Sequence, residues 1–267
     1  MRATVWICAA ACFAYAFGAG AQETQQEHGR RVVNDALKAL GGDAFLHMQD
    51  RVESGHAYSF YNKQLSGLEI ATIYTRYLAP VPGKAELRYR EVYGLKKDEG
   101  GRLITEDKGW EYNYHGARPL ADDFIATFRD SMLHNIFYIL RMRLDEPGLT
   151  CYFMGSDRFE SQPVNIVDIT DADNRTVTVY FSQLDKLPLR QSFKRRNETY
   201  HDFDTEVSLF AKYRDVGGGV MWPYDTRRER NGQKFFEMYA DNVEINKDLA
   251  DDVFSLPAKL KIMPKGK

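Results

Sequence analysis

The chain has 267 residues, of which 36 are lysine or arginine and 38 are aspartate or glutamate, so its formal net charge is −2. The near balance of charges gives no reason to expect a nucleic acid as a partner, and no polybasic cluster indicates binding to an anionic membrane surface. The length suits one large β-rich domain or two small ones.

The first 21 residues are typical of a signal peptide for export. Arg2 supplies a short positive start, residues 5–17 form an apolar core, and Ala19-Gly20-Ala21 is a small-x-small cleavage site. A transmembrane anchor is the alternative interpretation, but the apolar run is shorter than the roughly 20 residues that a span needs. We therefore expect a cleaved signal peptide and an exported mature chain, residues 22–267.

Cysteine usage excludes an intramolecular disulfide in the mature chain. Cys8 and Cys12 leave with the signal peptide, so only Cys151 remains. Cys151 lies in an apolar, strand-like run, residues 150–154, where a thiol is usually buried and inert rather than nucleophilic. A chain of this size without a disulfide must rely on a hydrophobic core.

Residues 27–40 are predicted to form an amphipathic helix. At 100° per residue, one face collects the apolar side chains, while the charged ones fall elsewhere. The members of the apolar face are Val32, Val33, Ala36, Leu37, Ala39 and Leu40. Gly41-Gly42 ends the helix, because glycine readily adopts the left-handed cap conformation. The helix has one dry side and is expected to pack on another element.

From residue 51 the pattern changes to short runs rich in Tyr, Val, Ile, Thr and Phe, separated by turn residues such as Pro80-Val81-Pro82-Gly83 and Gly100-Gly101. The predicted strands span residues 51–61, 68–78, 84–93, 109–114, 151–159, 164–170, 175–182, 187–195, 199–213, 220–230 and 234–245. Short links make neighbouring strands antiparallel, and a sheet of about eleven strands must curl.

Residues 121–144 are predicted to form a second, longer helix with an unusually wide apolar face. One face holds Phe124, Ile125, Phe128, Met132, Ile136, Ile139 and Met142, and Leu133, Phe137, Leu140 and Leu144 widen it. The apolar arc is then roughly 220°, whereas a helix resting on one core needs little more than 100°. The excess indicates two covered surfaces.

Two interpretations of the second surface remain open. The helix is either wedged between the sheet and the first helix, or it covers an apolar ligand. On the second interpretation the ligand-lining candidates are Phe124, Ile125, Phe128, Met132, Ile136, Ile139 and Leu140.

The polar residues do not form a catalytic or metal site by spacing. No His-Glu-x-x-His and no Cys-x-x-Cys occurs. In the densest polar run, Asp202, Asp204 and Glu206 share one face of a strand. They are able to bind calcium there, but such a face is more often solvated. A metal-dependent hydrolase using His201, Asp202 or Asp204 is the least favoured hypothesis. We expect no metal, no cofactor and no enzymatic activity.

Three consecutive glycines, Gly217-Gly218-Gly219, raise the question of a phosphate-binding loop. Such a loop needs a helix directly after the glycines, so that backbone N–H groups face the anion. Here Val220-Met221-Trp222-Pro223 follows, and Pro223 removes a donor where a helix would start. Asn231-Gly232, further on, is a strong hairpin signal. The triplet is therefore predicted to be a hairpin turn.

Several segments resemble the outer-membrane lipoprotein-sorting proteins of the LolA/LolB-like superfamily. The tail "AKYRDVGGGVMWPYDTRRERNGQKFFEMYADNVEINKDLADDVFSLPAKL" resembles their C-terminal region, with a Tyr-Arg strand, a glycine turn, a proline in the next strand and an Asn-Gly hairpin. The segment "SQPVNIVDITDADNRTVTVYFSQLDKLPLRQ" resembles their strand-turn-strand unit, and "RRVVNDALKALGG" their opening helix. Together these segments cover most of the mature chain.

The resemblance implies a single LolA-like domain over residues 22–267. Its fold class would be mainly β with helices (α+β): an incomplete antiparallel β-barrel of about eleven strands, with a helical lid over an apolar cavity. The cavity would shield the acyl chains of lipoproteins or other lipids in the periplasm. Since each buried methylene is worth about 0.8 kcal/mol, a 16-carbon chain involves on the order of 12 kcal/mol.

The chain departs from a dedicated sorting carrier in its greater length and its many tyrosines, which suit an amphipathic wall. The favoured hypothesis is a periplasmic carrier that binds acyl chains of lipoproteins or lipids and moves them toward the outer membrane, with a membrane-anchored donor or acceptor protein as a further partner. The alternative is an envelope-sensing regulatory module of the same fold, which binds lipid or lipoprotein and a membrane-anchored partner.

Overall fold

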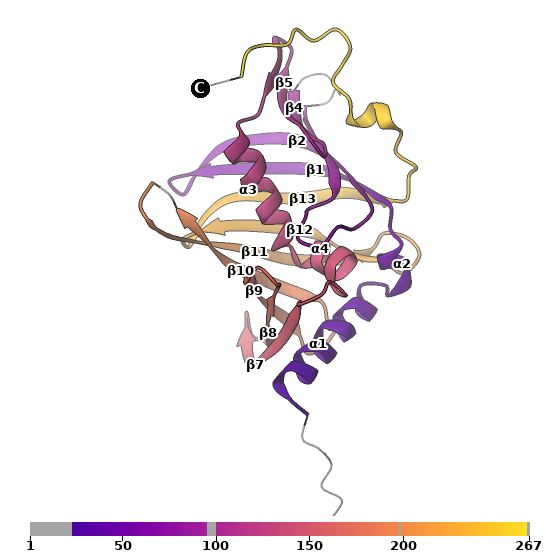
Figure 1. The fold of residues 1–267 in the computed structure, drawn as a ribbon, viewed down its shortest axis with the longest axis vertical. Helices are drawn as coiled ribbons and strands as arrows, with labels where there is room; N and C mark the ends of the chain where they lie inside the picture. The colour runs from indigo at the N-terminus through magenta and orange to yellow at the C-terminus, as the bar shows by residue number, and fades with distance from the viewer. Residues whose placement is uncertain (1–22, 95–99, 198, 266–267) are drawn as a thin grey trace, which may run out of the picture.

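A computed structural model of the protein describes residues 23–94, 100–197 and 199–265. The predicted signal peptide, residues 1–21, lies outside these described residues and stays a prediction. Within them, the chain forms one 13-stranded sheet (Figure 1), in the order β6-β5-β4-β3-β2-β1-β13-β12-β11-β10-β9-β8-β7. Every neighbouring pair is antiparallel. Since β6 and β7 do not pair, the barrel is incomplete, as predicted.

The strands follow the chain in hairpins except where β1 pairs with β13, which joins the first strands to the last. Their bounds are β1 Asp50–Tyr61, β2 Gln64–Tyr77, β3 Leu87–Tyr93, β4 Gly100–Ile104, β5 Gly109–Asn113, β6 Gly116–Pro119, β7 Thr150–Phe159, β8 Gln162–Thr170, β9 Thr176–Ser182, β10 Pro188–Asn197, β11 Asp202–Asp215, β12 Met221–Arg230 and β13 Gln233–Ile245.

The predicted number of strands, about eleven, was too low because β4 and β6 were missed. Gly100-Gly101 was interpreted as a turn, but both glycines lie in β4. A Cβ at Gly101 would lie 2.0 Å from the Glu91 carbonyl oxygen, so glycine is required there by close packing and not by a turn. The four residues of β6 carry no apolar alternation that would reveal a strand.

The glycine triplet turns the chain between two paired strands, as predicted. Gly217, Gly218 and Gly219 all have positive φ, and the Val216 N–H donates to the Val220 carbonyl at 2.8 Å. β12 begins directly afterwards and pairs with β11. Asn231-Gly232 likewise joins β12 to β13. The triplet has no helix after it that would present N–H groups to a phosphate.

The first helix, α1 Gln25–Ala39, begins at a capping box, in which the Thr24 side chain and the Glu27 side chain each accept from the other's backbone N–H. Its apolar side packs against β7 and β8. Gly41 and Gly42, both with positive φ, end it as predicted. Two short helices were not predicted, α2 Asp43–Leu46 and η2 Asp251–Phe254.

The prediction of one helix over residues 121–144 was wrong. The segment forms α3 Asp122–Leu133, then α4 Ile136–Tyr138, which continues as the π-helical turn η1 Ile139–Arg143. Asn135 causes the break, because its side-chain oxygen accepts from the N–H groups of Phe137 and Tyr138 at 3.0 and 3.1 Å and so caps a new helix. The apolar pattern runs through the break and hides it.

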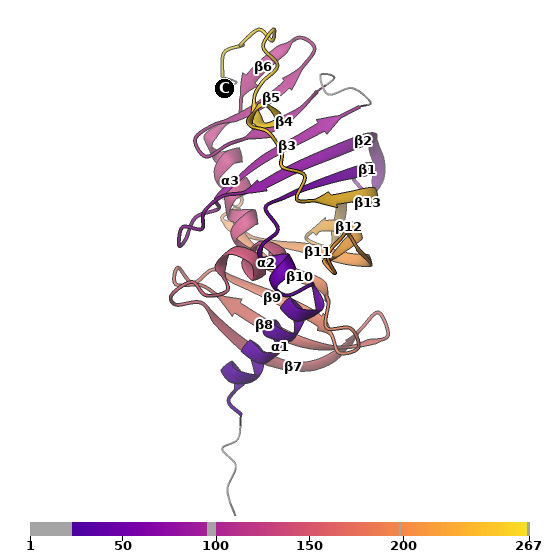
Figure 2. The ribbon, with the colours of Figure 1, turned by 90° about the vertical axis from the view of Figure 1, so that its right-hand side faces the viewer.

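The two faces of the sheet have different covers. α3 crosses one face in Figure 1, and α4, η1 and α1 close the main core at the β7–β10 end. The C-terminal segment, yellow in Figure 2, runs along β3 to β6. There Phe254 packs with Leu103, Tyr112 and Ala117 on the other face of these strands. One face of β3–β5 is thus sealed, and the other faces α3.

Candidate functional site

We define the concave face as the face of the sheet that α3, α4 and η1 cover. Phe210 on β11 marks it, because its ring lies 4.9 Å from that of Phe137 on α4. Side chains alternate along a strand, so Glu206 and Ser208 lie on the same face as Phe210. The same alternation and the strand register place Arg195, Arg228 and Arg230 on it from β10 and β12, and Glu53, Tyr89, Glu91 and Arg102 from β1, β3 and β4.

The predicted ligand-lining residues fall into two groups. Four lie on α3, where Phe124 is 39% exposed and the others, Ile125, Phe128 and Met132, are half-buried. Phe128 faces the sheet, with its ring 5.0 Å from that of Tyr89. The remaining three, Ile136, Ile139 and Leu140, are at most 2% exposed and belong to the main core. The segment is therefore a cover in its first half and core in its second.

The face below α3 is not apolar throughout, which corrects the predicted apolar cavity. Glu91 on β3 accepts hydrogen bonds of 2.8 Å from the hydroxyls of Tyr89 and Tyr93 and from the guanidinium of Arg102. Burial, with the nearby Glu91 carboxylate, raises the pKa of both tyrosines well above its ordinary value. Both phenols stay protonated and donate to Glu91, and Arg102 supplies the opposite charge, so the hydrogen bonds of Glu91 are satisfied within a wall of aromatic rings.

A second charge pair lies on the same face at β1. The guanidinium of Arg51 donates to Glu53 and, at 2.7 Å, to the hydroxyl of Tyr77. It stacks on Trp222, 3.9 Å from the ring centroid. Paired charges between aromatic rings satisfy their hydrogen bonds without bulk water. This part of the concave face is therefore amphipathic.

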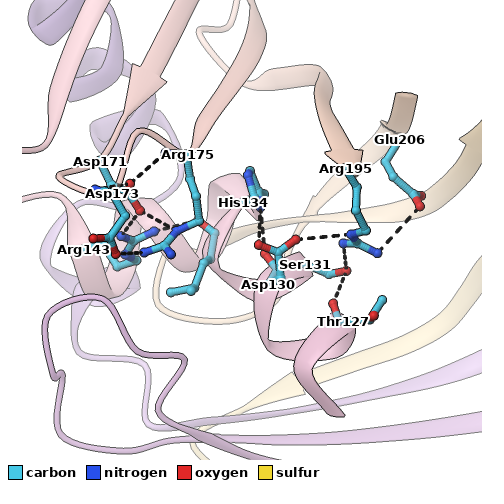
Figure 3. A network of polar contacts seen from close by, with 11 residues as sticks. Thr127, Asp130, Ser131, His134, Arg143, Asp171, Asp173, Arg175, Arg195 and Glu206 are labelled. Carbon is cyan, nitrogen blue, oxygen red and sulfur yellow. Dashed lines mark hydrogen bonds and ion pairs between the residues drawn. The ribbon is translucent and has the colours of Figure 1, made fainter. Parts of the chain in front are cut away.

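The third group of charges ties α3 to β10 and β11 (Figure 3). Arg195 donates to the Asp130 carboxylate at 3.2 Å and to the Ser131 hydroxyl at 2.7 Å, both on α3. Its other nitrogen lies 3.7 Å from Glu206. Arg230 forms a further ion pair with Glu206 at 2.8 Å. These contacts hold the C-terminal end of α3 over the sheet.

A buried ionic cluster anchors the chain after η1 (Figure 3). Arg143 donates to Asp171 at 2.7 Å, and Arg175 donates to Asp171 at 2.8 Å. Arg143 also donates to Glu146 at 2.6 Å. Burial opposes the charge on Asp171, but the hydrogen bonds from Arg143 and Arg175 lower the pKa of its carboxyl group. The cluster fixes the core half of the 121–144 segment. Arg143 also donates to the carbonyl oxygen of Leu133 at 2.7 Å, so the cluster holds the last residue of α3 as well.

His134, at the end of α3, is buried against Phe193, with ring centroids 4.1 Å apart. Its Nδ1 lies 2.8 Å from the carbonyl oxygen of Asp130, so this nitrogen carries the proton and donates. Burial lowers the pKa of His134, with further lowering by Arg195 and Arg175. The ring is therefore neutral at pH 7, and it serves as packing surface next to the Arg195 contacts.

Two hollows open elsewhere on the described surface. One of about 340 Å³ lies between α1, η1 and the loop after β2, and Leu37, Val81 and Leu140 contribute to its apolar walls. The other, of about 540 Å³, lies on the side of β11–β13 opposite to α3 and is lined in part by Leu209, Arg227 and Tyr239. Both have the size of ligand pockets, but charged residues line each of them. Leu140 is the predicted lining residue that reaches one.

Two of the carboxylates considered for metal binding, Asp204 and Glu206, have other partners. Asp204 accepts from Asn197 and Asn231, and Glu206 pairs with Arg195 and Arg230. Across residues 23–94, 100–197 and 199–265, no group of three His, Cys, Asp or Glu side chains is placed to hold a metal ion. In the same part of the chain, no helix has the length and apolarity to cross a membrane.

Cys151 is buried, as predicted, on β7 beneath α1. Burial raises the pKa of its thiol to about 11. A thiol with this pKa is almost entirely protonated at pH 7 and is a poor nucleophile. Cys151 therefore has the properties of a core residue.

The polar residues of the concave face were not among the candidates from the sequence. Glu91 and Arg195 come from strands that are far apart in the chain, and the charges that satisfy them come from other strands or from α3. One local signal was present: Tyr89, Glu91 and Tyr93 recur at every second position of a predicted strand. This spacing puts all three on one face, and a carboxylate between two tyrosines already indicates an amphipathic wall.

No protein-family model matches the chain, and no curated protein matches its sequence. Solved structures match its fold. A domain named for outer membrane lipoprotein sorting, from Vibrio parahaemolyticus, has a TM-score of 0.58 and 10% identity, covering 86% of this chain and 97% of its own. A DUF1329 family protein from Desulfovibrio piger has a TM-score of 0.60 and 13% sequence identity, and the match covers 87% of this chain and 98% of that protein's chain. A LolA superfamily protein from Nitrosomonas europaea has a TM-score of 0.52 and 10% sequence identity, and the match covers 85% of this chain and 97% of that protein's chain.

These likenesses define the class of structure: an open antiparallel β-barrel with a few helices, the LolA-like fold. The resemblance of the tail, of the strand-turn-strand unit and of the opening helix to this class is thereby confirmed at the level of the fold. With identities of 10 to 13%, the likenesses carry no further information about what the chain binds.

Proposed function

We propose that this protein is a periplasmic carrier that binds the acyl chains of lipoproteins or other lipids and moves them toward the outer membrane, without catalysis. The observation that carries the proposal is the incomplete burial of α3. This helix has four large apolar side chains toward the concave face, Phe124, Ile125, Phe128 and Met132, but only Leu133 among its residues is buried. Apolar surface left in this state on a cover helix is suited to contact an apolar ligand.

The ligand-facing role is assigned to these four side chains of α3. Ile136, Ile139 and Leu140 instead hold α4 and η1 in the core, where they give α3 a fixed point at its C-terminal end. The names of two fold relatives, one for outer membrane lipoprotein sorting and one for the LolA superfamily, support the same class of cargo.

A carrier must also release its cargo, and the contacts of α3 suit this need. Arg195 contacts the end of α3 through hydrogen bonds that water readily replaces. A cover held by such contacts has a closed and an open position of similar free energy, and a ligand shifts the balance between them. A fully buried helix would have no second position of comparable free energy.

Two measurements on the mature chain, residues 22–267, test the proposal. Native mass spectrometry after purification without detergent is expected to show co-purified lipid. Titration with the uncharged fluorescent probe N-phenyl-1-naphthylamine is expected to show saturable binding that a 16-carbon chain displaces. A protein that carries no lipid and does not bind the probe is not a carrier of acyl chains.

A further inference from the structure

Arg228 on β12 differs from the other arginines of the concave face because its guanidinium has no hydrogen-bond or ion-pair partner among the residues that the structure describes. No hydrogen bond or ion pair joins it to any of the described residues, and its one ring contact is with Phe235, 5.3 Å from the ring centroid. Its nitrogens keep some contact with solvent, because the one fully buried side-chain nitrogen without a partner in the described chain is Nε of Arg227. Donors of Arg228 are thus available to a ligand.

The carboxylates around Arg228 are committed to other partners. Glu206 pairs with Arg230 at 2.8 Å and lies 3.7 Å from Arg195. Asp204 accepts from Asn231 and Asn197, at 2.7 and 2.9 Å. The residues opposite Arg228 in the strand register are Ser208 and Phe236, which carry no charge. Among the described residues, therefore, no carboxylate forms an ion pair with Arg228.

The position of Arg228 makes this charge costly. The side chain is half-buried, and burial lowers the pKa of its guanidinium, against the opposing influence of Glu206 and Tyr89. Tyr89 belongs to β3, which β13, β1 and β2 separate from β12 in the sheet. The strand register places Arg228 and Tyr89 on the same, concave face of the sheet. A half-buried charge without a counter-ion destabilises the fold unless a bound ligand supplies the opposite charge.

We propose that Arg228 binds the anionic headgroup, a carboxylate or a phosphate, of an amphiphile on the concave face, so that the protein selects acidic amphiphiles over neutral ones. This inference rests on the proposed carrier function and adds the chemical class of its ligand. The planar guanidinium presents its donors in a fork that matches two oxygens of either group. Phe235 and Phe236 beside it offer apolar surface to the first methylenes of the chain.

The test compares three ligands with the same 16-carbon chain: hexadecanoic acid, hexadecyl phosphate and hexadecanol. Each is used at a concentration below its critical aggregation concentration to displace N-phenyl-1-naphthylamine from the mature chain. The two acids are expected to bind about tenfold to a hundredfold tighter than the alcohol, the range of one charge-assisted bidentate contact. The acid with the larger preference identifies the headgroup, carboxylate or phosphate.

In Arg228→Gln the acids are expected to fall to the affinity of hexadecanol, with hexadecanol binding unchanged, and Arg228→Lys should retain part of the preference. Arg227→Gln removes the same charge from the opposite face of the same strand and should behave as the wild type. Thermal unfolding of each variant confirms folding. Equal binding of acids and alcohol by the wild type, or a preference that survives in Arg228→Gln, overturns this inference and leaves the carrier function standing. Failure of all three ligands to bind overturns both.

Discussion

The guanidinium of Arg195 on β10 donates a 2.7 Å hydrogen bond to the hydroxyl of Ser131 on α3. A second bond from Arg195 reaches Asp130, one residue earlier. At the far side of the helix, Arg129 donates to the carbonyl group of Glu106, in the loop after β4. α3 is therefore fastened across the open barrel at two sides by polar contacts, with little buried apolar surface of its own.

Removing the Arg195 contact is expected to loosen α3 and leave the rest of the fold intact. In Arg195→Met, the amide hydrogens of α3 should exchange about tenfold faster, since about 1.4 kcal/mol of local stabilisation is lost. The amides of α4 and β10 should keep their rates. Hydrogen exchange read by mass spectrometry measures both.

Arg190→Met is the matched control for this change. Arg190 lies on the same strand with its side chain on the opposite face, where it contacts Ser192 and Tyr180. Unchanged exchange of α3 in Arg195→Met would mean that packing, and not the Arg195 contacts, holds the helix.

Two aspartate substitutions separate the cover from the core. Phe128 is half-buried on α3, so Phe128→Asp should fold and lose binding of the apolar probe by about tenfold or more. Ile136 is fully buried, and an unpaired carboxylate there should destabilise the fold by about 4 kcal/mol or more. Circular dichroism and probe titration measure the two effects.

Leu184→Asp is the control for the introduced charge, because Leu184 is 73% exposed in the turn after β9. It should fold and bind as the wild type does. The prediction fails if Phe128→Asp binds the probe normally, since α3 would then not contact the ligand. It fails equally if Ile136→Asp is stable, since the core half of the segment would then be misplaced.

The burial of His134 predicts a dependence of stability on pH. Its folded pKa lies below the unfolded value of about 6.5, so the unfolded state binds more protons in the window below that pH. The free energy of unfolding should therefore fall as the pH drops from 7.5 to 5.5. Asp130 favours the proton and Arg195 and Arg175 oppose it, with burial as the main cause.

The measurement is urea unfolding at several pH values for the wild type and for His134→Phe. The phenyl ring keeps the stacking on Phe193 and cannot take up a proton. The variant should show a smaller loss of stability over this window, while the other histidines contribute equally to both proteins. Parallel curves for the two proteins would show that His134 does not titrate differently in the folded state.

The sheet could be predicted from the sequence where the signal is local. Asn231-Gly232 fixes a hairpin by the conformation of two residues, and Pro223 after the glycine triplet excludes a helix there. β4 could not be predicted because glycine is required at position 101 by the close approach of the Glu91 backbone. That approach exists only once β3 and β4 pair. The break at Asn135 was hidden because the apolar period continues through it.

The candidate site could be predicted only in part, for a physical reason. The apolar half, represented by Phe128, follows from the period of one helix. The polar half does not, because the partners of Glu91 and Arg195 are set by strand register and by the placement of α3. That Arg228 has no partner within the described part of the chain is likewise a property of the assembled sheet.

The thiol of Cys151 should report on unfolding. Its pKa is about 11 and it is 3% exposed, so at pH 8 its reaction with 5,5′-dithiobis(2-nitrobenzoic acid) should be at least about 100-fold slower than in the chain unfolded in guanidinium. A protein that comprises residues 22–267 has no other cysteine, so the absorbance change is assigned without ambiguity. Rapid labelling of the native protein would mean that α1 does not cover β7.

Gly29 is expected to be required by the contact of α1 with β7, although glycine weakens a helix. Alanine at a helix interior normally stabilises by about 1 kcal/mol relative to glycine. At Gly29, however, an added Cβ would lie 2.5 Å from the Cys151 carbonyl oxygen and 2.9 Å from the Phe153 nitrogen. Both are backbone atoms of a paired strand and cannot turn away, so α1 would have to shift from the core at a cost of about 1–3 kcal/mol.

Gly29→Ala should therefore lower the free energy of unfolding by about 1–2 kcal/mol, the overpacking cost exceeding the propensity gain. Urea unfolding at pH 7.5 measures the change. Gln26→Ala, at an exposed position of the same helix, should lie within about 0.5 kcal/mol of the wild type. Cys151 labelling of Gly29→Ala should be faster than in the wild type, because a displaced α1 uncovers the thiol. A more stable Gly29→Ala would show that the helix does not approach the strand this closely.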